Sequence, residues 1–107
     1  MYSLNEQTLV GNLGQDAEIF QSNGKSFFKF NVATTLKWKD KQGEVQEKTQ
    51  WHSIVFFNDG LKDFAELRLK KGTRVFLRGR TEHSNYTDKE GVERTRTQVI
   101  GQDIIVL

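Results

Sequence analysis

Alternation between apolar and polar side chains is clearest over residues 49–57, TQWHSIVFF, and predicts a β-strand. Side chains two positions apart share a face, so Trp51, Val55 and Phe57 point to one side and the residues between them to the other. Only one face can line a core, and a strand that is apolar on both faces is either covered twice or presents rings on a binding surface. We expect Trp51 and Phe57 on an outer face, roughly 20 Å apart at about 3.3 Å per residue, a spacing that suits an extended polymer.

The segment from Lys25 alternates in the same way and predicts a half-buried strand of about ten residues with lysines on its outer side. Its inner side takes Phe28, Phe30, Val32 and Leu36. Strict alternation would add Trp38 to that side. Because KWKDKQGE contains the turn formers Asp40 and Gly43, we expect the register to end in a long polar hairpin loop that leaves Trp38 outside the core.

Shorter patterns predict the other elements. Residues 7–12 and 18–21 are typical of short strands, and LKDFAELRLKK, which ends before Gly72, predicts the one helix. Residues 73–82 predict a strand with Val75, Leu77 and Gly79 facing inward. Its outward side chains are Arg74, Phe76, Arg78 and Arg80. We expect a second long loop holding Tyr86, then a last strand over residues 94–107.

Three strands, one helix and two further strands form the order of an OB-fold. We therefore predict an all-β protein, a five-stranded Greek-key barrel with one helix between strands 3 and 4. A length of 107 residues allows one core and not two, so residues 1–107 should form a single domain. The fold by itself leaves the function open.

Composition excludes several classes of protein. The chain has no cysteine, which rules out disulfides and Cys-ligated zinc or iron–sulfur sites, and we expect no cofactor or metal. No apolar run approaches the roughly 18 residues of a membrane span, and MYSLNEQT does not look like a signal peptide. We expect a cytoplasmic, nucleoid-associated protein without a membrane contact.

Positive charge is concentrated in two blocks, although the formal net charge is only +2. Residues 24–41 hold five lysines against Asp40, and residues 60–82 carry a local excess of basic over acidic side chains. Interleaved with rings, these cations suit contact with phosphates; otherwise they form a solvated face. The candidate phosphate contacts are Lys25, Lys29, Lys37, Lys39, Arg74, Arg78 and Arg80.

Five segments resemble the bacterial single-stranded DNA-binding proteins. They are LVGNLGQDAE, FNVATTLKWKDKQGE, TQWHSIVFF, LKKGTRVFLRGR and YTDKEGVER, and the resemblance extends over nearly the whole chain. The resemblance implies sequence-independent binding of single-stranded DNA in replication, recombination and repair, in a homo-oligomer that is usually a tetramer. The rings that it implies for base stacking are Trp38, Trp51, Phe57 and Tyr86.

Three features depart from that family. Asn5, Glu6 and Gln7 stand where a lysine is usual, and Tyr86 stands where some members have tryptophan. The family's Gly/Gln/Pro-rich linker and acidic tip do not follow Leu107, so we expect the partner recruitment that depends on the tip to be absent or removed.

Other interpretations remain open for individual residues and for the whole chain. Phe76 with its neighbouring arginines fits a subunit interface, and a lone His52 is typically structural. An enzyme is disfavoured, because the aspartates are spread over turns and GNLG at residues 11–14 is not a phosphate loop. The alternatives are a short primosomal OB-fold protein, an RNA-binding OB module, or a protein–protein adaptor.

Overall fold

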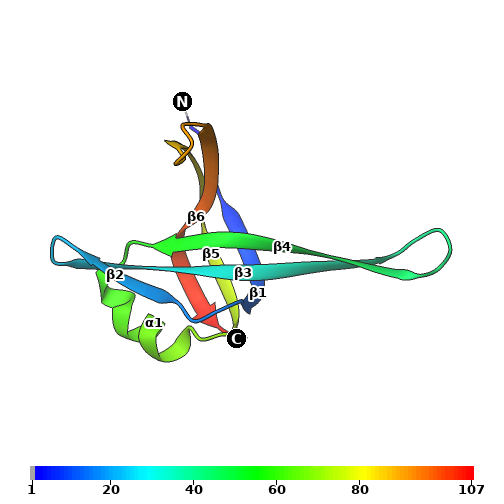
Figure 1. Cartoon of the computed structure of the whole chain (residues 1–107). Helices are drawn as coiled ribbons and strands as arrows, with labels where there is room; N and C mark the ends of the chain where they lie inside the picture. Colours follow the sequence, from blue (N-terminus) through cyan, green and yellow to red (C-terminus); the bar gives the residue numbers. More distant parts are fainter. Residues whose placement is uncertain (1) are drawn as a thin grey trace.

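Six strands and one short α-helix make up the chain over residues 2–107, the part that the computed structural model describes (Figure 1). The strands are β1 (Gln7–Leu13), β2 (Glu18–Ser22), β3 (Lys25–Lys39), β4 (Val45–Phe56), β5 (Arg74–Thr87) and β6 (Glu93–Val106). A 3-10 turn, Asp59–Leu61, leads from β4 into the helix α1 (Lys62–Arg68).

Five of the strands close into a barrel. The strand order is β1-β5-β6-β4-β3-β2, and β1 also pairs with β3, so β1, β5, β6, β4 and β3 form a closed ring. Strand β2 follows β1 in the chain and lies outside this ring, against β3. All pairings are antiparallel except the short parallel one between β4 and β6. This is the predicted OB-fold barrel, with α1 between its third and fourth strands.

The core is formed by the inward rows of the barrel strands and by the helix. Phe28, Phe30 and Phe56 stack with ring centroids 5.2 to 6.2 Å apart. Burying a side chain of this size contributes about 1.5–3 kcal/mol. Ala65 of α1 and the adjacent Leu69 are buried in the same cluster, which confirms the helix predicted over this segment.

The inward set predicted for the strand at 73–82 is confirmed. Val75, Leu77 and Gly79 are buried, whereas the arginines on either side of them are exposed. The structural interpretation of His52 also agrees with the geometry. Its Nε2 lies 2.8 Å from Oγ1 of Thr34, a diagonal neighbour on β3, in a partly buried hydrogen bond.

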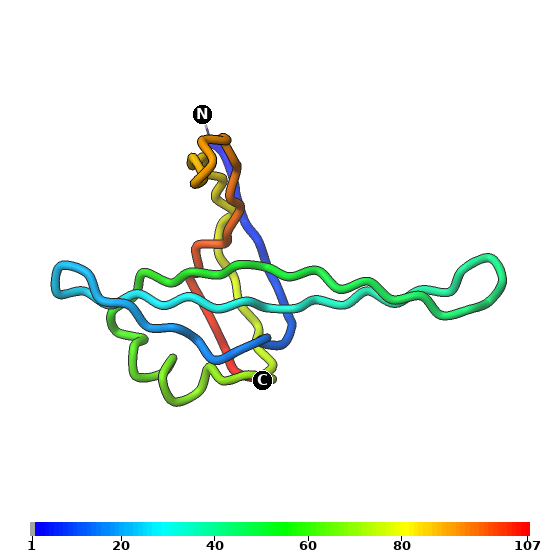
Figure 2. Tube along the Cα trace, in the orientation of Figure 1, coloured from blue at the N-terminus to red at the C-terminus, as the bar shows by residue number. Residues whose placement is uncertain are grey.

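Both hairpins predicted to have long loops continue instead as two-stranded arms. β3 and β4 pair without interruption as far as Lys39 and Val45, and β5 and β6 pair as far as Thr87 and Glu93 (Figures 1 and 2). The expected end of the register at Trp38 was therefore wrong. A ribbon exposed to water on both faces needs no apolar alternation, so its sequence resembles that of a loop.

Three positions differ from the sequence-based expectation. Leu36, predicted in the core, is 66% exposed, because β3 has left the barrel by that residue. Tyr86 lies in β5 and not in a loop. Val55 keeps the predicted parity with Trp51, yet it is only 1% exposed, because it lies in the middle of the sheet between Lys29 of β3 and Ile100 of β6.

Candidate nucleic-acid interface

The outer side of β3 and β4 gathers aromatic and cationic side chains. Trp51 pairs with Ala33. The pair of Val55 and Lys29 lies four residues further along the strands, on the same side. Phe57 follows directly after β4 and continues this parity. We call the outward side chains Lys25, Phe27, Lys29, Trp51 and Phe57 the β3–β4 outer face.

Both predicted rings of this face are open to solvent: Trp51 is 62% and Phe57 64% exposed. Trp51 is nevertheless seated, because its ring lies over Gly14, where a Cβ would come 2.5 Å from ring atom Cζ3. The absence of a side chain at Gly14 thus makes room for the indole. The prediction of Trp51 and Phe57 outside the core is confirmed.

Phe57 is fixed by the polar residues that follow it. The Asn58 side chain accepts a hydrogen bond from the Gly60 N–H at 3.0 Å, which caps the 3-10 turn. Asp59 Oδ1 accepts from the Ser26 N–H at 2.8 Å and ties this turn to the start of β3. The segment after β4 is therefore joined to the start of β3.

A groove of about 930 Å³ runs beside Phe57. Lys25 and Arg80 line it together with Phe27, Phe57 and Ile100. Arg80 reaches this groove from β5 because it pairs with Ile100, which in turn pairs with Val55. The structure thus brings Arg80 and Lys25 to the same hollow as one of the predicted rings.

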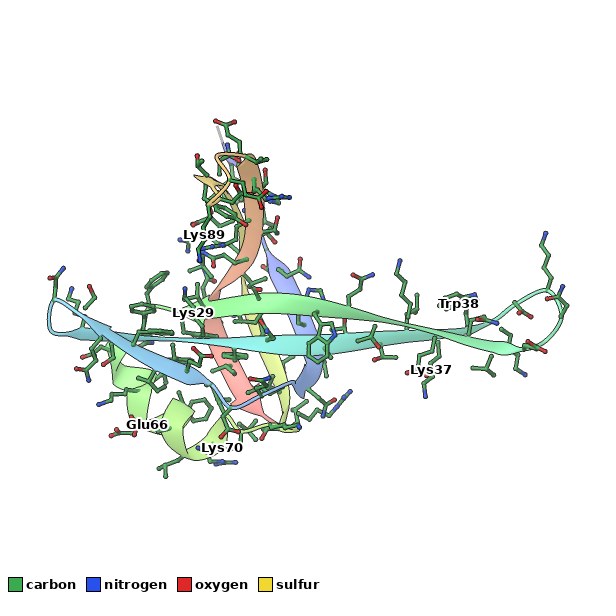
Figure 3. All side chains as sticks on the ribbon, in the orientation of Figure 1. Lys29, Lys37, Trp38, Glu66, Lys70 and Lys89 are labelled. Atoms are coloured by element: carbon green, nitrogen blue, oxygen red, sulfur yellow. The ribbon has the colours of Figure 1, made fainter. Side chains whose placement is uncertain are left out.

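The two remaining predicted rings lie on the arms. Trp38 is 45% and Tyr86 42% exposed. Figure 3 shows Trp38 and Lys37 on the β3–β4 arm, well away from the barrel. Trp38 pairs with Gln46, on the opposite side of the ribbon from Trp51, whereas Lys37 and Lys39 keep the parity of Trp51. The four rings therefore do not share one flat face.

The two arm tips have the same construction. Asp40 accepts backbone N–H bonds from Gln42 and Glu44 at 2.9 and 3.0 Å. At the other tip, Asp88 accepts the corresponding pair from Glu90 and Val92, both at 2.9 Å. Each turn closes at a glycine with positive φ. In both arms the ring lies two residues before the aspartate, so one turn design positions both Trp38 and Tyr86.

These hydrogen bonds lower the pKa of both carboxyls. For Asp40 the largest cause is the backbone N–H of Glu44, with Gln46 and Gln42 adding to it. For Asp88 the largest cause is the side chain of Arg94, whose Nε lies 2.8 Å from Oδ2. Both tips are therefore held by charged carboxylates at neutral pH.

Sequence reasoning missed four residues of this surface. Arg96 lies over the Tyr86 ring, 4.8 Å from its centroid, and Arg94 pairs with Tyr86 across the arm. Phe27 and Phe20 form a stack beside Phe57. Phe27 was detectable, because alternation places it between Lys25 and Lys29; Arg94 and Arg96 carried no such signal, since their segment was not expected to pair with Tyr86.

Arg74 and Arg78 lie elsewhere on β5. They flank Phe76, which lines up with Val10 of β1 and Ile105 of β6 in one row across the sheet. Arg78 pairs with Asp103 at 2.7 Å, and Arg74 donates to Asn12 Oδ1 at 3.0 Å. The structure does not bring these two arginines to the groove beside Phe57.

Residues 2–107 contain neither a metal-ligand cluster nor a membrane-spanning helix. No cluster of three or more His, Cys, Asp or Glu side chains there has the arrangement of a metal site. No helix in this range is long and apolar enough to cross a membrane.

The fold and this surface define an OB-fold barrel with an aromatic and cationic outer side. The model of the single-strand binding protein family matches residues 4–107, so the chain belongs to that family. It is 41% identical to single-stranded DNA-binding protein 1 of Xylella fastidiosa, covering all of this chain and 79% of that protein. It is 38% identical to the single-stranded DNA-binding protein of Neisseria meningitidis, covering 98% of this chain and 60% of that protein.

Solved structures agree with this assignment. The Plasmodium falciparum SSB in complex with single-stranded DNA superposes with a TM-score of 0.91 at 28% identity, covering 100% of this chain and 97% of that one. A deletion mutant of the single-stranded DNA-binding protein from Thermus aquaticus gives 0.81 at 25% identity, covering 97% of this chain and 50% of that one. Family membership confirms the prediction of a binding protein in place of an enzyme.

Proposed function

We propose that this chain binds single-stranded DNA without regard to sequence and protects it during replication, recombination and repair. The observation that carries the proposal is the β3–β4 outer face, where two exposed rings on one side of the paired strands are separated by Lys29. Bases of any identity offer a π-face for stacking, and lysines follow phosphates without reading bases. The similarity to proteins named for this activity supports it.

The proposed contacts follow the geometry. Bases stack on Trp51 and Phe57 of the barrel. Further bases stack on Trp38 and Tyr86 of the two arms, which flank the bound DNA. Phosphate contacts are proposed for Lys25, Lys29, Lys37, Lys39 and Arg80, whereas Arg74 and Arg78, predicted from the sequence as further contacts, flank Phe76 away from the groove. Among them, Lys25 and Arg80 are best placed, because they line the groove beside Phe57. Arg80 has first to exchange its ion pair with Glu82, whose carboxylate lies 3.9 Å from the guanidinium.

We also propose that the chain assembles as a homo-oligomer, a tetramer by analogy with the family. The row of Val10, Phe76 and Ile105 supports this, because Val10 and Ile105 are exposed although they lie in the middle of strands. An apolar row of this kind is suited to a second copy of the chain. With DNA as its partner, we place the protein at the nucleoid in the cytoplasm.

Titration with poly(dT), followed by tryptophan fluorescence, tests the proposed function. We expect quenching of Trp51 and Trp38, preference for single strands over duplex, and a decline in log affinity of roughly 0.7 per neutralised phosphate per decade of salt. Leu67→Ala, at an exposed apolar residue on α1, is the matched control and should bind like the wild type. Stronger binding to duplex, or to poly(rU), would contradict the proposal.

A further inference from the structure

Three phenylalanines form a continuous row on the outside of the sheet. Phe20 of β2 pairs with Phe27 of β3, and their rings stack with centroids 5.1 Å apart and planes 16° apart. Phe27 lies 5.6 Å from the ring of Phe57, so the row continues across the end of β4. None of the three belongs to the buried core cluster. Their packing therefore serves the outer surface, and Phe20 and Phe57 remain more than one third exposed.

A cation stands directly over this row. Nζ of Lys29 lies 5.6 Å from the ring centroid of Phe20 and 5.9 Å from that of Phe27. No carboxylate within ion-pair distance holds Lys29 among the described residues. Lys29 lies on the barrel part of β3, far from Trp38 and Lys37 of the arm (Figure 3). One nucleotide can contact both groups of this arrangement: its base can stack on the exposed rings, and its phosphate can pair with the positive charge.

The Phe57 end of this row lines the groove described above. Phe27 and Phe57 form its aromatic wall, and Lys25 and Arg80 supply its positive charge. Asp59 also lines the groove, where its Oδ1 accepts the Ser26 N–H, and Arg80 is paired with Glu82 at 3.9 Å. Strand β2 lies at the edge of the sheet beyond β3, so the row ends in open solvent on the Phe20 side. Phe20 is 37% exposed, so a nucleotide can reach the row at this end.

We infer that Phe27 and Phe20 form a second stacking platform, continuous with Phe57, that takes one or two further nucleotides of single-stranded DNA. The inference rests on the proposed function and extends its site to β2. In the free protein Lys29 covers the ring pair; on binding, a base replaces the ammonium on the rings and Lys29 pairs with the phosphate of the same nucleotide. The single-stranded DNA therefore runs from Trp51 past Lys29 to Phe57 and leaves the protein over β2.

Phe27→Leu and Phe20→Leu test the platform, because leucine keeps the apolar bulk and removes the π-face. Each variant should bind poly(dT) at least about threefold more weakly than the wild type and should occlude fewer nucleotides per protein. Photocrosslinking to oligo(dT) carrying 5-iodouracil, mapped by mass spectrometry, should label the peptides that contain Phe20 and Phe27. Leu67→Ala is the control on α1 and should change none of these measurements.

The outcomes separate the two hypotheses. If the wild type binds poly(dT) and Trp51→Ala weakens it, while both leucine variants bind normally and β2 and β3 stay unlabelled, the platform is wrong and the proposed function stands. If the wild type fails to bind poly(dT), both fall. If Phe27→Leu melts at a lower temperature than the wild type, its binding no longer tests the platform. The binding of Phe20→Leu and the crosslinks of the wild type then decide whether the platform exists.

Discussion

At the scale of single residues, Trp51 shows how an apolar side chain is kept out of the core without being loose. Its parity along β4 places it opposite Ile54, which is buried. Its ring rests on Gly14, and the exposed side of the indole faces solvent. A ring that is seated in advance loses little conformational entropy when a base stacks on it.

Trp51→Ala should separate binding from stability. Loss of the ring should weaken single-strand affinity by roughly 1–3 kcal/mol, with Phe57→Ala and Tyr86→Ala at or below the low end because their faces are smaller. The melting temperature should stay nearly unchanged. Ile54→Ala, on the opposite side of the strand, should cost about 2–5 kcal/mol of folding stability. Fluorescence titration and thermal melting measure the two effects; unfolding of Trp51→Ala with affinity intact would show that the faces are reversed.

Gly14→Ala should affect the same ring indirectly. The added methyl would overlap the indole of Trp51, which is the exposed partner and has room to move. We expect a folded protein with a shifted tryptophan emission maximum and weaker DNA binding. Leu67→Ala, at an exposed residue of α1, is a control that should leave the emission unchanged. Identical emission spectra for Gly14→Ala and wild type would contradict the seating of Trp51 on Gly14.

At the scale of elements, the arms are the part that the sequence predicted least well. Alternation identified the barrel part of β3 because water wets only one side there, and it placed Phe28 and Phe30 correctly. Beyond the barrel both sides of the ribbon are wet, so Leu36 and Tyr86 were misplaced. The turn chemistry of Asp40 and Asp88 was visible, but the register that joins β3 to β4 is a tertiary property.

The candidate site residues also divide into those that alternation along one strand predicts and those that depend on the pairing of strands. Trp51 and Phe57 were predictable, because a second apolar face on one strand needs an explanation. The platform of Phe27 and Phe20 depends on β2 pairing with β3, and the separation of Arg78 from Arg80 depends on which neighbour each meets on β6. Neither pairing can be read from spacing along the chain.

Acid should loosen both arm tips. The pKa of Asp88 lies below its ordinary value of 3.8, so its stabilising contribution is complete above that value and disappears as the pH falls through the lower pKa of the folded state. The same holds for Asp40. Amide shifts of Gly91 and Gly43, followed by NMR from pH 6 to pH 2, should show transitions with midpoints below 3.8.

Asp88→Asn serves as the internal control for this titration. It should abolish the transition at Gly91 and leave that at Gly43 unchanged, because the two arms extend in different directions from the barrel (Figure 2). A midpoint for Gly91 at or above 3.8 in the wild type would show that the hydrogen bonds of the tip do not favour the charged carboxylate.

At the scale of the whole molecule, the barrel presents two different surfaces. One carries Trp51, Lys29 and Phe57 on β3 and β4, and the other carries the row of Val10, Phe76 and Ile105 across β1, β5 and β6. The arms extend from the barrel in different directions (Figure 2). The molecule measures 56 Å along its longest axis. If copies of the chain join through the apolar row, the β3–β4 outer face of each copy stays free. Single-stranded DNA can then pass from one copy to the next.

Charge placed in the apolar row should therefore dissociate the protein without unfolding it. Light scattering of the wild type should give a multiple of the 12.4 kDa chain mass at micromolar concentration, whereas Ile105→Lys should approach the single-chain value. Ile105 is exposed in the isolated chain, so the melting curve of the variant should remain cooperative. Short oligo(dT) should still bind, because the β3–β4 outer face is intact, while affinity for long poly(dT) should fall as the linkage between copies is lost. A wild type that scatters as a 12.4 kDa monomer would remove the basis for this interface, and equal affinities of variant and wild type for long poly(dT) would show that each barrel acts alone.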